Sequence, residues 1–250
     1  MKLPTLGLGT VAFGRDWGLK YPQRTHRTSL PTDSELDRLL SVAEELGVTL
    51  LDTAPAYGSS EERLGTLLRG RSHSFVISTK AGETSTPQGS TFDFRPSTLR
   101  ASVERSLERL YVDVLDFVFL HAGPDDSEAL GGLETLLRLR DEGKVRWVGA
   151  STKSVQGGLR AVETCDAVML TYNHQDRSQE EVLDKAGGQT KVLIKKPLAS
   201  GHVGAPDEAL RFVAEHPAVD SVVVGTTNVE HLRANARAIN SVSCENSTRS

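Results

Sequence analysis

Short runs of apolar, largely β-branched residues recur along the whole chain. Runs of this length without polar alternation are typical of strands that are buried on both faces. We expect eight such strands, over residues 6–10, 49–54, 75–80, 114–121, 145–152, 167–173, 191–197 and 221–226.

The segments between these runs carry apolar residues at helical spacing. In residues 34–46, for example, Leu36, Leu39, Leu40, Ala43 and Leu46 fall on one stripe. The pattern predicts helices over 34–46, 97–110, 127–142, 154–163, 178–186, 206–215 and 228–238, and a further helix start in the Ser/Glu cluster near residue 60. Several of them begin at Ser, Asp or Asn, residues that cap helix N-termini.

Eight strand–helix units with short connections predict a closed parallel (β/α)8 barrel, the TIM barrel, as a single domain over residues 1–240. An open doubly wound sheet is the competing arrangement. The small polar residues 241–250 predict a loose C-terminal tail.

Composition limits the classes of partner. The 250 residues carry a formal net charge of −4, so there is no basic excess for nucleic acid or an anionic membrane. No apolar run approaches the roughly 20 residues needed to span a bilayer, and the N-terminus lacks the apolar core of a signal peptide. The two cysteines, Cys165 and Cys244, have no metal-ligand spacing. We therefore expect a cytoplasmic protein without a metal.

Polar side chains gather where three consecutive expected strands end. Asp52, Lys80 and His121 lie at or next to these ends, and Tyr57 follows Asp52 closely. In a parallel barrel the carboxyl ends of the strands share one rim, where the reactive residues lie.

The four residue types suit proton transfer. A phenol with a pKa of about 10 is a poor acid near neutrality unless a cation stabilises its phenolate. Lys80 can supply that charge, Asp52 can hold the lysine, and His121 can donate to a substrate oxygen. Any one of them alone is most often a satisfied polar group. Together they predict reversible proton transfer at a carbonyl or an alcohol.

The stretch "GVTLLDTAPAYGSSEERLG", residues 47–65, resembles the signature of the aldo-keto reductases, G-x-x-x-x-D-T-A-x-x-Y-G followed by S-E-x-x-L-G. Every fixed position matches: Gly47, Asp52, Thr53, Ala54, Tyr57, Gly58, Ser60, Glu61, Leu64 and Gly65. The resemblance continues through "STK", "VFLH", "VRWVGAS", "YN" and "PLASG" to "VVVGTTNVEHLRAN".

This resemblance implies a barrel in which a nicotinamide cofactor passes hydride to an aldehyde or ketone. Tyr57 would be the general acid, Lys80 and Asp52 its tuning partners, and His121 the group that orients the carbonyl. The hydride chemistry belongs to the cofactor.

The resemblance also implies a set of cofactor contacts. These are Gly9, Thr10, Asp52, Ser151, Thr152, Lys195, Lys196, Pro197, Leu198, Gly225, Thr226, Thr227, Asn228, His231 and Asn235. The Gly7-x-Gly9 pair is not a Rossmann fingerprint, because no third glycine opens a helix. The helix start near Asn228 is instead expected to offer free N–H groups and its dipole to a phosphate.

Several cofactor positions depart from the family pattern. Gly225 and His231 replace the usual lysine and arginine, although Arg233 is near, so NADP(H) is expected ahead of NAD(H) while the preference stays open. Met169 replaces a glutamine. Thr152 replaces an asparagine, so Ser151 is the retained contact to the carboxamide.

Lys195 replaces the aromatic residue that stacks on the nicotinamide ring. Contact of Lys195 and Lys196 with cofactor phosphates is one hypothesis, and solvation of one of them is the other.

The sequence gives fewer indications of the residues that contact the substrate. Trp17 and Tyr21 in the first loop are candidate walls beside Tyr57 and His121, although a loop tryptophan is as often a packing anchor. The chain is short for the family, which predicts an open site with broad aldehyde preference.

Three functions remain open at this point. The first is a monomeric NAD(P)H-dependent carbonyl reductase. The second is a sugar or polyol dehydrogenase that works with NAD+, and the third is a non-catalytic nucleotide-binding regulatory subunit on the same barrel.

Overall fold

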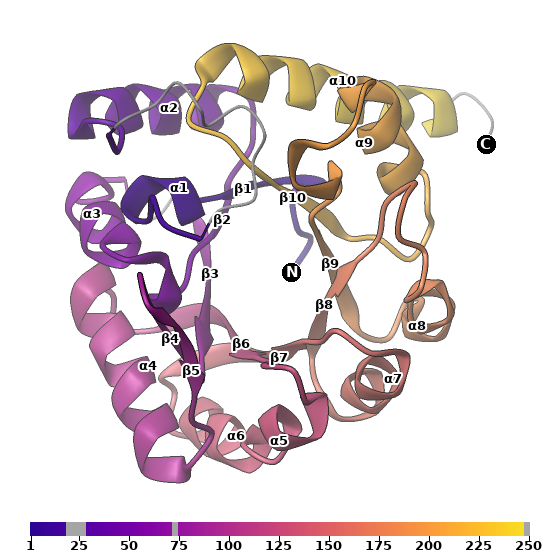
Figure 1. Cartoon of the computed structure of the whole chain (residues 1–250). Coiled ribbons are helices and arrows are strands. Elements are labelled where there is room, and N and C mark those ends of the chain that lie inside the picture. Colours follow the sequence, from indigo (N-terminus) through magenta and orange to yellow (C-terminus); the bar gives the residue numbers. More distant parts are fainter. Residues whose placement is uncertain (19–28, 72–74, 248–250) are drawn as a thin grey trace.

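The computed structural model describes residues 1–18, 29–71 and 75–247, with side chains up to Val242. Eight parallel strands form a closed barrel in the order β1-β10-β9-β8-β7-β6-β3-β2 (Figure 1). Their bounds are β1 Leu6–Gly9, β2 Leu50–Asp52, β3 Val76–Ala81, β6 Leu115–His121, β7 Val145–Ser151, β8 Ala167–Thr171, β9 Lys191–Lys195 and β10 Ser221–Gly225. Each lies inside or within one residue of an expected strand. The first and last strands pair in parallel, so the barrel is confirmed over the open sheet.

Helices surround the barrel as an outer ring (Figure 1). They are α1 Val11–Gly14, α2 Asp33–Glu45, α3 Ser60–Leu67, α4 Pro96–Leu110, α5 Asp126–Leu130, α6 Leu133–Asp141, α7 Val155–Thr164, α8 Glu180–Ala186, α9 Pro206–Ala214 and α10 Val229–Ser247, with 3-10 turns η2 Pro55–Tyr57 and η3 Ala199–Gly201. Throughout the described ranges, every helix is too short or too polar to cross a membrane.

The core has two layers. One cluster packs between the strands and the surrounding helices. The other fills the barrel interior and consists of Leu3, Leu50, Phe117, Phe119, Ala167, Met169, Leu193 and Val223. Because side chains alternate sides along a strand, residues two positions beyond these also face inward. This alternation places the polar ends of the strands in the barrel mouth.

Two elements differ from the expected pattern. After β3 the chain forms an antiparallel hairpin, β4 (Glu83–Thr86) paired with β5 (Gly89–Phe92). Its residues are mostly Ser, Thr and Gly, which carry no apolar alternation. The helix expected over 127–142 is split into α5 and α6 at Gly131 and Gly132, since glycine weakens a helix interior.

The C-terminal segment is also different. The prediction of a loose tail from Ser241 is wrong for residues 241–247, because α10 continues to Ser247. Leu232, Ile239 and Val242 are all buried, at spacings that keep them on one helix face. The apolar stripe thus extends past the residue at which the expected helix ends. The side chain of Cys244 lies outside the description.

Candidate active site

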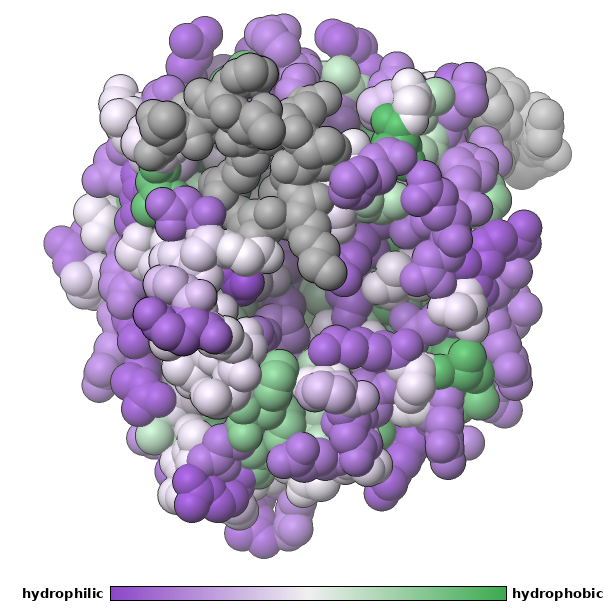
Figure 2. Space-filling model, viewed as in Figure 1, coloured by the Kyte–Doolittle hydropathy of each residue, from purple (hydrophilic) through white to green (hydrophobic). Residues whose placement is uncertain are grey.

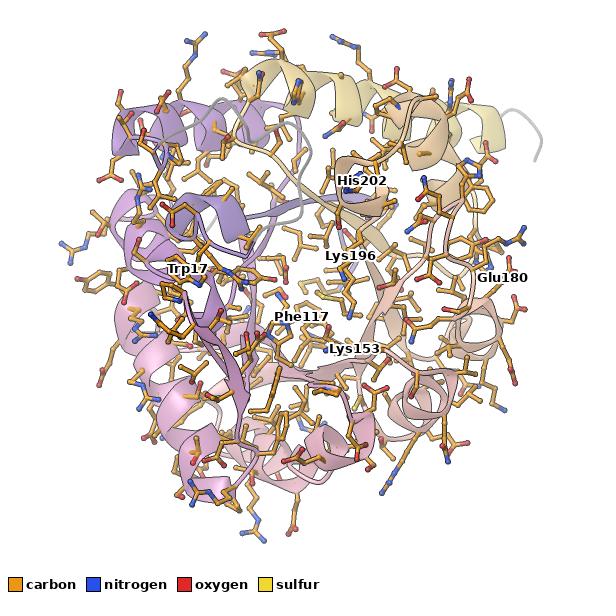
Figure 3. All side chains as sticks on the ribbon, viewed as in Figure 1. Trp17, Phe117, Lys153, Glu180, Lys196 and His202 are labelled. Atoms are coloured by element: carbon orange, nitrogen blue, oxygen red, sulfur yellow. The ribbon has the colours of Figure 1, made fainter. Side chains whose placement is uncertain are left out.

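The last inward-facing residue of each strand differs in kind from the apolar interior beneath it. These residues are Gly9, Asp52, Lys80, His121, Ser151, Thr171, Lys195 and Gly225. Figure 3 shows Phe117 near the centre of the barrel, with Trp17 on one side of the mouth and Lys153 and Lys196 on the other. Figure 2 shows a hollow near the centre of this face, among mainly hydrophilic side chains.

Asp52 and Lys80 form a buried ion pair across neighbouring strands. The Lys80 Nζ donates to both carboxylate oxygens of Asp52 at 2.8 Å and to the carbonyl oxygen of Thr53 at 2.9 Å. Ser78 donates to the same carboxylate at 3.0 Å. Burial disfavours the charge of Lys80, but Asp52 and Tyr57 outweigh it and raise the lysine pKa. Lys80 therefore keeps its ammonium charge.

Tyr57 lies over this ion pair. The centroid of its ring is 4.7 Å from Lys80 Nζ. The tyrosine ends the turn η2, and Gly58 follows with φ of 62°. A Cβ atom on Gly58 would lie 2.1 Å from the carbonyl oxygen of Gly14, so only glycine fits here. The close contact with α1 holds the phenol beside the ammonium.

His121 completes the group. Its ring centroid lies 6.3 Å from that of Tyr57, and the two rings are nearly perpendicular. The imidazole Nδ1 is 2.8 Å from Oε2 of Glu83, in an ion-pair contact whose N–H is not aligned as in a good hydrogen bond. Ser90 donates to the other oxygen of Glu83 at 2.6 Å. The four predicted catalytic residues therefore lie together at one rim, and we call them the tetrad.

His121 and Glu83 shift each other's pKa. Burial lowers the pKa of His121, and Glu83 opposes that shift. Burial raises the pKa of Glu83, but contact with His121 outweighs it and lowers the pKa to about 2. Sequence reasoning missed Glu83, because it belongs to the hairpin that the pattern did not predict.

Other signature residues support the site from within the wall. Ser60 at the start of α3 accepts from the hydroxyl of Thr53 at 3.0 Å and lies 2.9 Å from the hydroxyl of Thr10. Thr10 also donates to the carbonyl oxygen of Asp52 at 3.0 Å. Thr10 is fully buried in the ligand-free structure, and its role as a cofactor contact stays a prediction. Glu61 accepts from Thr79 at 2.6 Å, and burial raises its pKa.

Ser151 and Lys195 meet on the opposite side of the mouth. The Lys195 Nζ donates to Ser151 Oγ at 2.8 Å and to the carbonyl oxygen of Thr152 at 2.9 Å. Burial, and then the charges of nearby lysines, lower the pKa of Lys195 to about 7. Lys196 is exposed, with φ of 54°. Contact of this lysine pair with cofactor phosphates stays a prediction, and in the structure Lys195 contacts Ser151.

Residues around this pair are mostly structural. Thr152 is buried, and its hydroxyl lies 3.4 Å from the side-chain amide of Gln179. Met169 belongs to the interior cluster and lies below the mouth. Asn173 donates to the carbonyl oxygen of Lys196 at 3.0 Å and so holds the turn before Pro197 and Leu198, of which the proline is buried.

The junction of β10 and α10 is the candidate phosphate region. Gly9 and Gly225 pair on neighbouring strands, and a Cβ on Gly9 would lie 3.4 Å from the Gly225 backbone. This edge of the mouth therefore carries no side chain. Thr226 Oγ1 accepts from Asn228 N–H at 3.1 Å, while Thr227 is half-buried.

The expectation of free N–H groups at this helix start needs correction. Asn228 Oδ1 accepts from the backbone N–H of Glu230 at 2.8 Å and of His231 at 3.3 Å. His231 is exposed, whereas Arg233 lies 3.5 Å from Glu45 of α2. Asn235 is buried one turn further on.

Trp17 lies at the edge of the mouth nearest Tyr57. A Cβ on Gly58 would lie 3.1 Å from Cη2 of its ring. Its Nε1 is buried and has no hydrogen-bond partner among the residues that the structure describes. The interpretation of Trp17 as a substrate wall stays a prediction, and Tyr21 lies outside the described residues.

Within the described residues, no three His, Cys, Asp or Glu side chains cluster as a metal site would require.

Comparison with known proteins gives the family of this chain. The model of the Aldo/keto reductase family matches residues 5–201. A solved structure from Pseudomonas aeruginosa, assigned to the aldo-keto reductases, superposes with a TM-score of 0.86 at 40% sequence identity, covering 96% of this chain and 90% of that one.

Two curated relatives are named as an oxidoreductase and a dehydrogenase. The Bacillus subtilis oxidoreductase YqkF is 27% identical over 248 residues, covering 81% of each chain. The L-galactose dehydrogenase of Arabidopsis thaliana is 26% identical over 257 residues, covering 82% of this chain and 79% of its own. Because the family model spans most of the chain, this protein belongs to the aldo/keto reductase family and is an NAD(P)-dependent oxidoreductase.

Proposed function

We propose that this protein reduces small aldehydes and ketones to alcohols with NAD(P)H, and that Tyr57 is the general acid. One observation carries the proposal: the phenol of Tyr57 lies between a buried ammonium and an imidazole at the barrel mouth, with Lys80 Nζ 4.7 Å from its ring centroid.

The proton transfer follows from these contacts. Tyr57 donates its O–H proton to the carbonyl oxygen while a C–H bond forms at the carbonyl carbon, which leaves an alcohol and a phenolate. Lys80 stabilises the phenolate because its ammonium stays charged beside Asp52. Solvent then returns a proton to Tyr57. When bound, the nicotinamide cofactor supplies the hydride.

His121 directs the substrate oxygen toward Tyr57. Its ring stands nearly perpendicular to the phenol and shares the mouth with it. Glu83 contacts Nδ1 and thereby fixes the orientation of the ring, which makes Glu83 a positioning residue.

The chain's own residues fit a dinucleotide. In its protonated form Lys195 has only donors, so Ser151 Oγ accepts from it, and the serine proton is left to donate to a carboxamide oxygen. The edge without side chains at Gly9 and Gly225 gives the chain of the cofactor room to pass. Thr226, Thr227, Asn228 and Asn235 would hold the adenosine end, provided that Asn228 releases its helix cap.

NADP(H) is the expected cofactor ahead of NAD(H), because Arg233 lies near the helix start at which the family resemblance implies the adenosine phosphate, although Gly225 and His231 replace the usual lysine and arginine. The preference is expected to be small, since Arg233 already contacts Glu45 at 3.5 Å.

A second candidate is the reverse reaction, the oxidation of a sugar hydroxyl by NAD+ or NADP+. The similarity to an L-galactose dehydrogenase favours it. The groups that return a proton in one direction remove it in the other, so the tetrad serves both. The regulatory-subunit alternative has no comparable support, and we expect a monomer.

Steady-state assays test the proposal. Purified protein is given NADH, NADPH, NAD+ and NADP+ in turn, against a panel of aldehydes, ketones, sugars and polyols. We expect faster turnover with reduced cofactors and small aldehydes, with weak selectivity among them. Binding of none of the four dinucleotides would contradict the proposal, and faster turnover of polyols at physiological pH would select the second candidate.

A further inference from the structure

We propose that Lys195 makes this protein bind the reduced nicotinamide dinucleotide more tightly than the oxidised one. The inference rests on the proposed dinucleotide site at Ser151. It extends that function by assigning a redox preference to a residue of this chain.

The position of Lys195 is the first support. It is the last inward-facing residue of β9, and its Nζ lies 2.8 Å from Ser151 Oγ. A carboxamide that accepts from Ser151 therefore brings its ring close to this amine. The second contact, to the carbonyl oxygen of Thr152 at 2.9 Å, holds the amine at this place.

The charges around Lys195 are the second support. Lys80 on β3, Lys153 after β7 and Lys196 after β9 all act on it with the same sign, and Asp126 on α5 is the carboxylate that opposes them. Asp126 is itself engaged by the backbone N–H groups of Lys153 and Ser154. Lys80, by contrast, has Asp52 as a direct partner. Within the described residues, Lys195 forms no ion pair.

The charge of the ligand then decides the effect. An oxidised nicotinamide ring carries one positive charge, and the reduced ring is neutral. A nearby ammonium in a part-buried mouth repels the oxidised ring and has no such effect on the reduced ring. One like-charge contact of this kind is worth on the order of tenfold in relative affinity.

Protonation of Lys195 should therefore set the preference. Its pKa of about 7 means that it loses its charge as the pH rises through neutrality. The ratio of dissociation constants, oxidised over reduced, should fall by several-fold between pH 6 and pH 9. Burial lowers the pKa of His121, which also feels the charge of Lys195, so its titration moves away from the neutral and alkaline part of this range.

Equilibrium binding provides the test and needs no turnover. Dissociation constants for NADPH and NADP+ are measured by calorimetry at pH 6, 7, 8 and 9. In Lys195→Met the ratio should fall about tenfold at pH 6 and lose most of its pH dependence. In Lys195→Arg, which keeps the charge, the ratio should stay high at every pH.

Lys153→Met is the matched control, because it removes a mouth charge from an exposed side chain, and its ratio at pH 6, where Lys195 is charged, should change less than threefold. Thermal melting of each variant checks folding, and the pH series of the unaltered protein needs no variant at all. A ratio that is independent of pH and unchanged in Lys195→Met overturns this inference. Failure of the unaltered protein to bind either dinucleotide instead overturns the proposed function.

Discussion

The two halves of the barrel mouth are built differently. In the proton-transfer half, formed by Asp52, Tyr57, Lys80 and His121, charged groups are buried against one another, and Asp52 and Lys80 are 4% and 2% exposed. In the cofactor half, formed by Ser151, Lys195 and the junction of β10 with α10, polar groups pair among themselves, with Ser151 buried, Lys195 half-buried and Asn228 exposed.

Under the proposed function, the difference reflects the separate task of each half. Proton transfer needs one geometry and one charge state, so its groups are fixed by the fold before any ligand arrives. The cofactor half must accept a large ligand, and its present contacts, such as the Asn228 cap, occupy donors that a ligand would use. Variants in the first half should therefore change turnover, and variants in the second should change affinity.

Tyr57→Phe should have the largest effect. The phenyl ring keeps the packing against Gly58 and Lys80 but has no proton to give, so kcat should fall by about 10²- to 10⁴-fold. Affinity for the dinucleotide, measured by fluorescence titration, should change less than about threefold. A variant that keeps more than about a tenth of the turnover contradicts the general-acid role.

Asp52→Asn tests whether the buried ion pair contributes to the stability of the fold separately from its contribution to turnover. It leaves a buried ammonium without its counter-charge, which should cost about 3–5 kcal/mol in the free energy of unfolding. Urea unfolding measures this loss.

The double variant Asp52→Asn with Lys80→Met is the control, because it removes both charges. Its stability should recover in large part while turnover stays low. Recovery of turnover along with stability would mean that the ion pair has only a structural role.

Glu83→Gln tests the positioning of His121. Glu83 supports the protonated imidazole, so its loss should lower the pKa of His121 further. The acid limb of the pH profile of kcat/KM should therefore move to lower pH, with a fall in kcat/KM of about three- to tenfold. An unmoved limb contradicts the assignment.

Stability gives an independent measure of the same contact. The pKa of Glu83 is lowered in the folded protein to about 2, from 4.5, so its contribution is present above about pH 4.5 and is lost as the pH falls toward 2. The difference in unfolding free energy between the natural chain and Glu83→Gln should shrink over this range. Urea unfolding at pH 6, 4.5 and 3 follows it.

The smallest effect is expected at Arg233. Arg233→Ala should weaken NADPH binding by about two- to fivefold and leave NADH binding unchanged, as is usual for an exposed charge. Glu45→Gln is the matched variant, because it releases Arg233 and should strengthen NADPH binding slightly. Equal changes for NADPH and NADH in either variant would show that the extra phosphate does not lie there.

Much of the fold and of the proton-transfer half was predictable because both depend on local pattern. Each apolar run and the polar residue at its end lie within a few positions of each other, so strand alternation alone places Lys80 and His121 in the mouth. The hairpin was not predictable, since "ETSTPQGSTF" carries no apolar alternation. Glu83 was missed with it.

The cofactor half was less predictable for a different reason. A motif at a helix start indicates unsatisfied N–H groups, but it does not show which side chain already accepts from them. Asn228 does so here. Likewise the local sequence around Lys195 does not show that its amine points inward to Ser151 while the neighbouring Lys196 is exposed to solvent.

The sequence by itself determined the barrel, the order of its strands and the rim on which the tetrad lies. The reason is that each apolar run and the polar residue at its end are close together in the chain, so the local pattern contains both. The sequence indicated the pair of Asp52 with Lys80, and only the tertiary structure decided the contacts of His121 with Glu83 and of Ser151 with Lys195. Those pairs join residues 28 to 44 positions apart, and their charge states depend on burial that no local pattern contains.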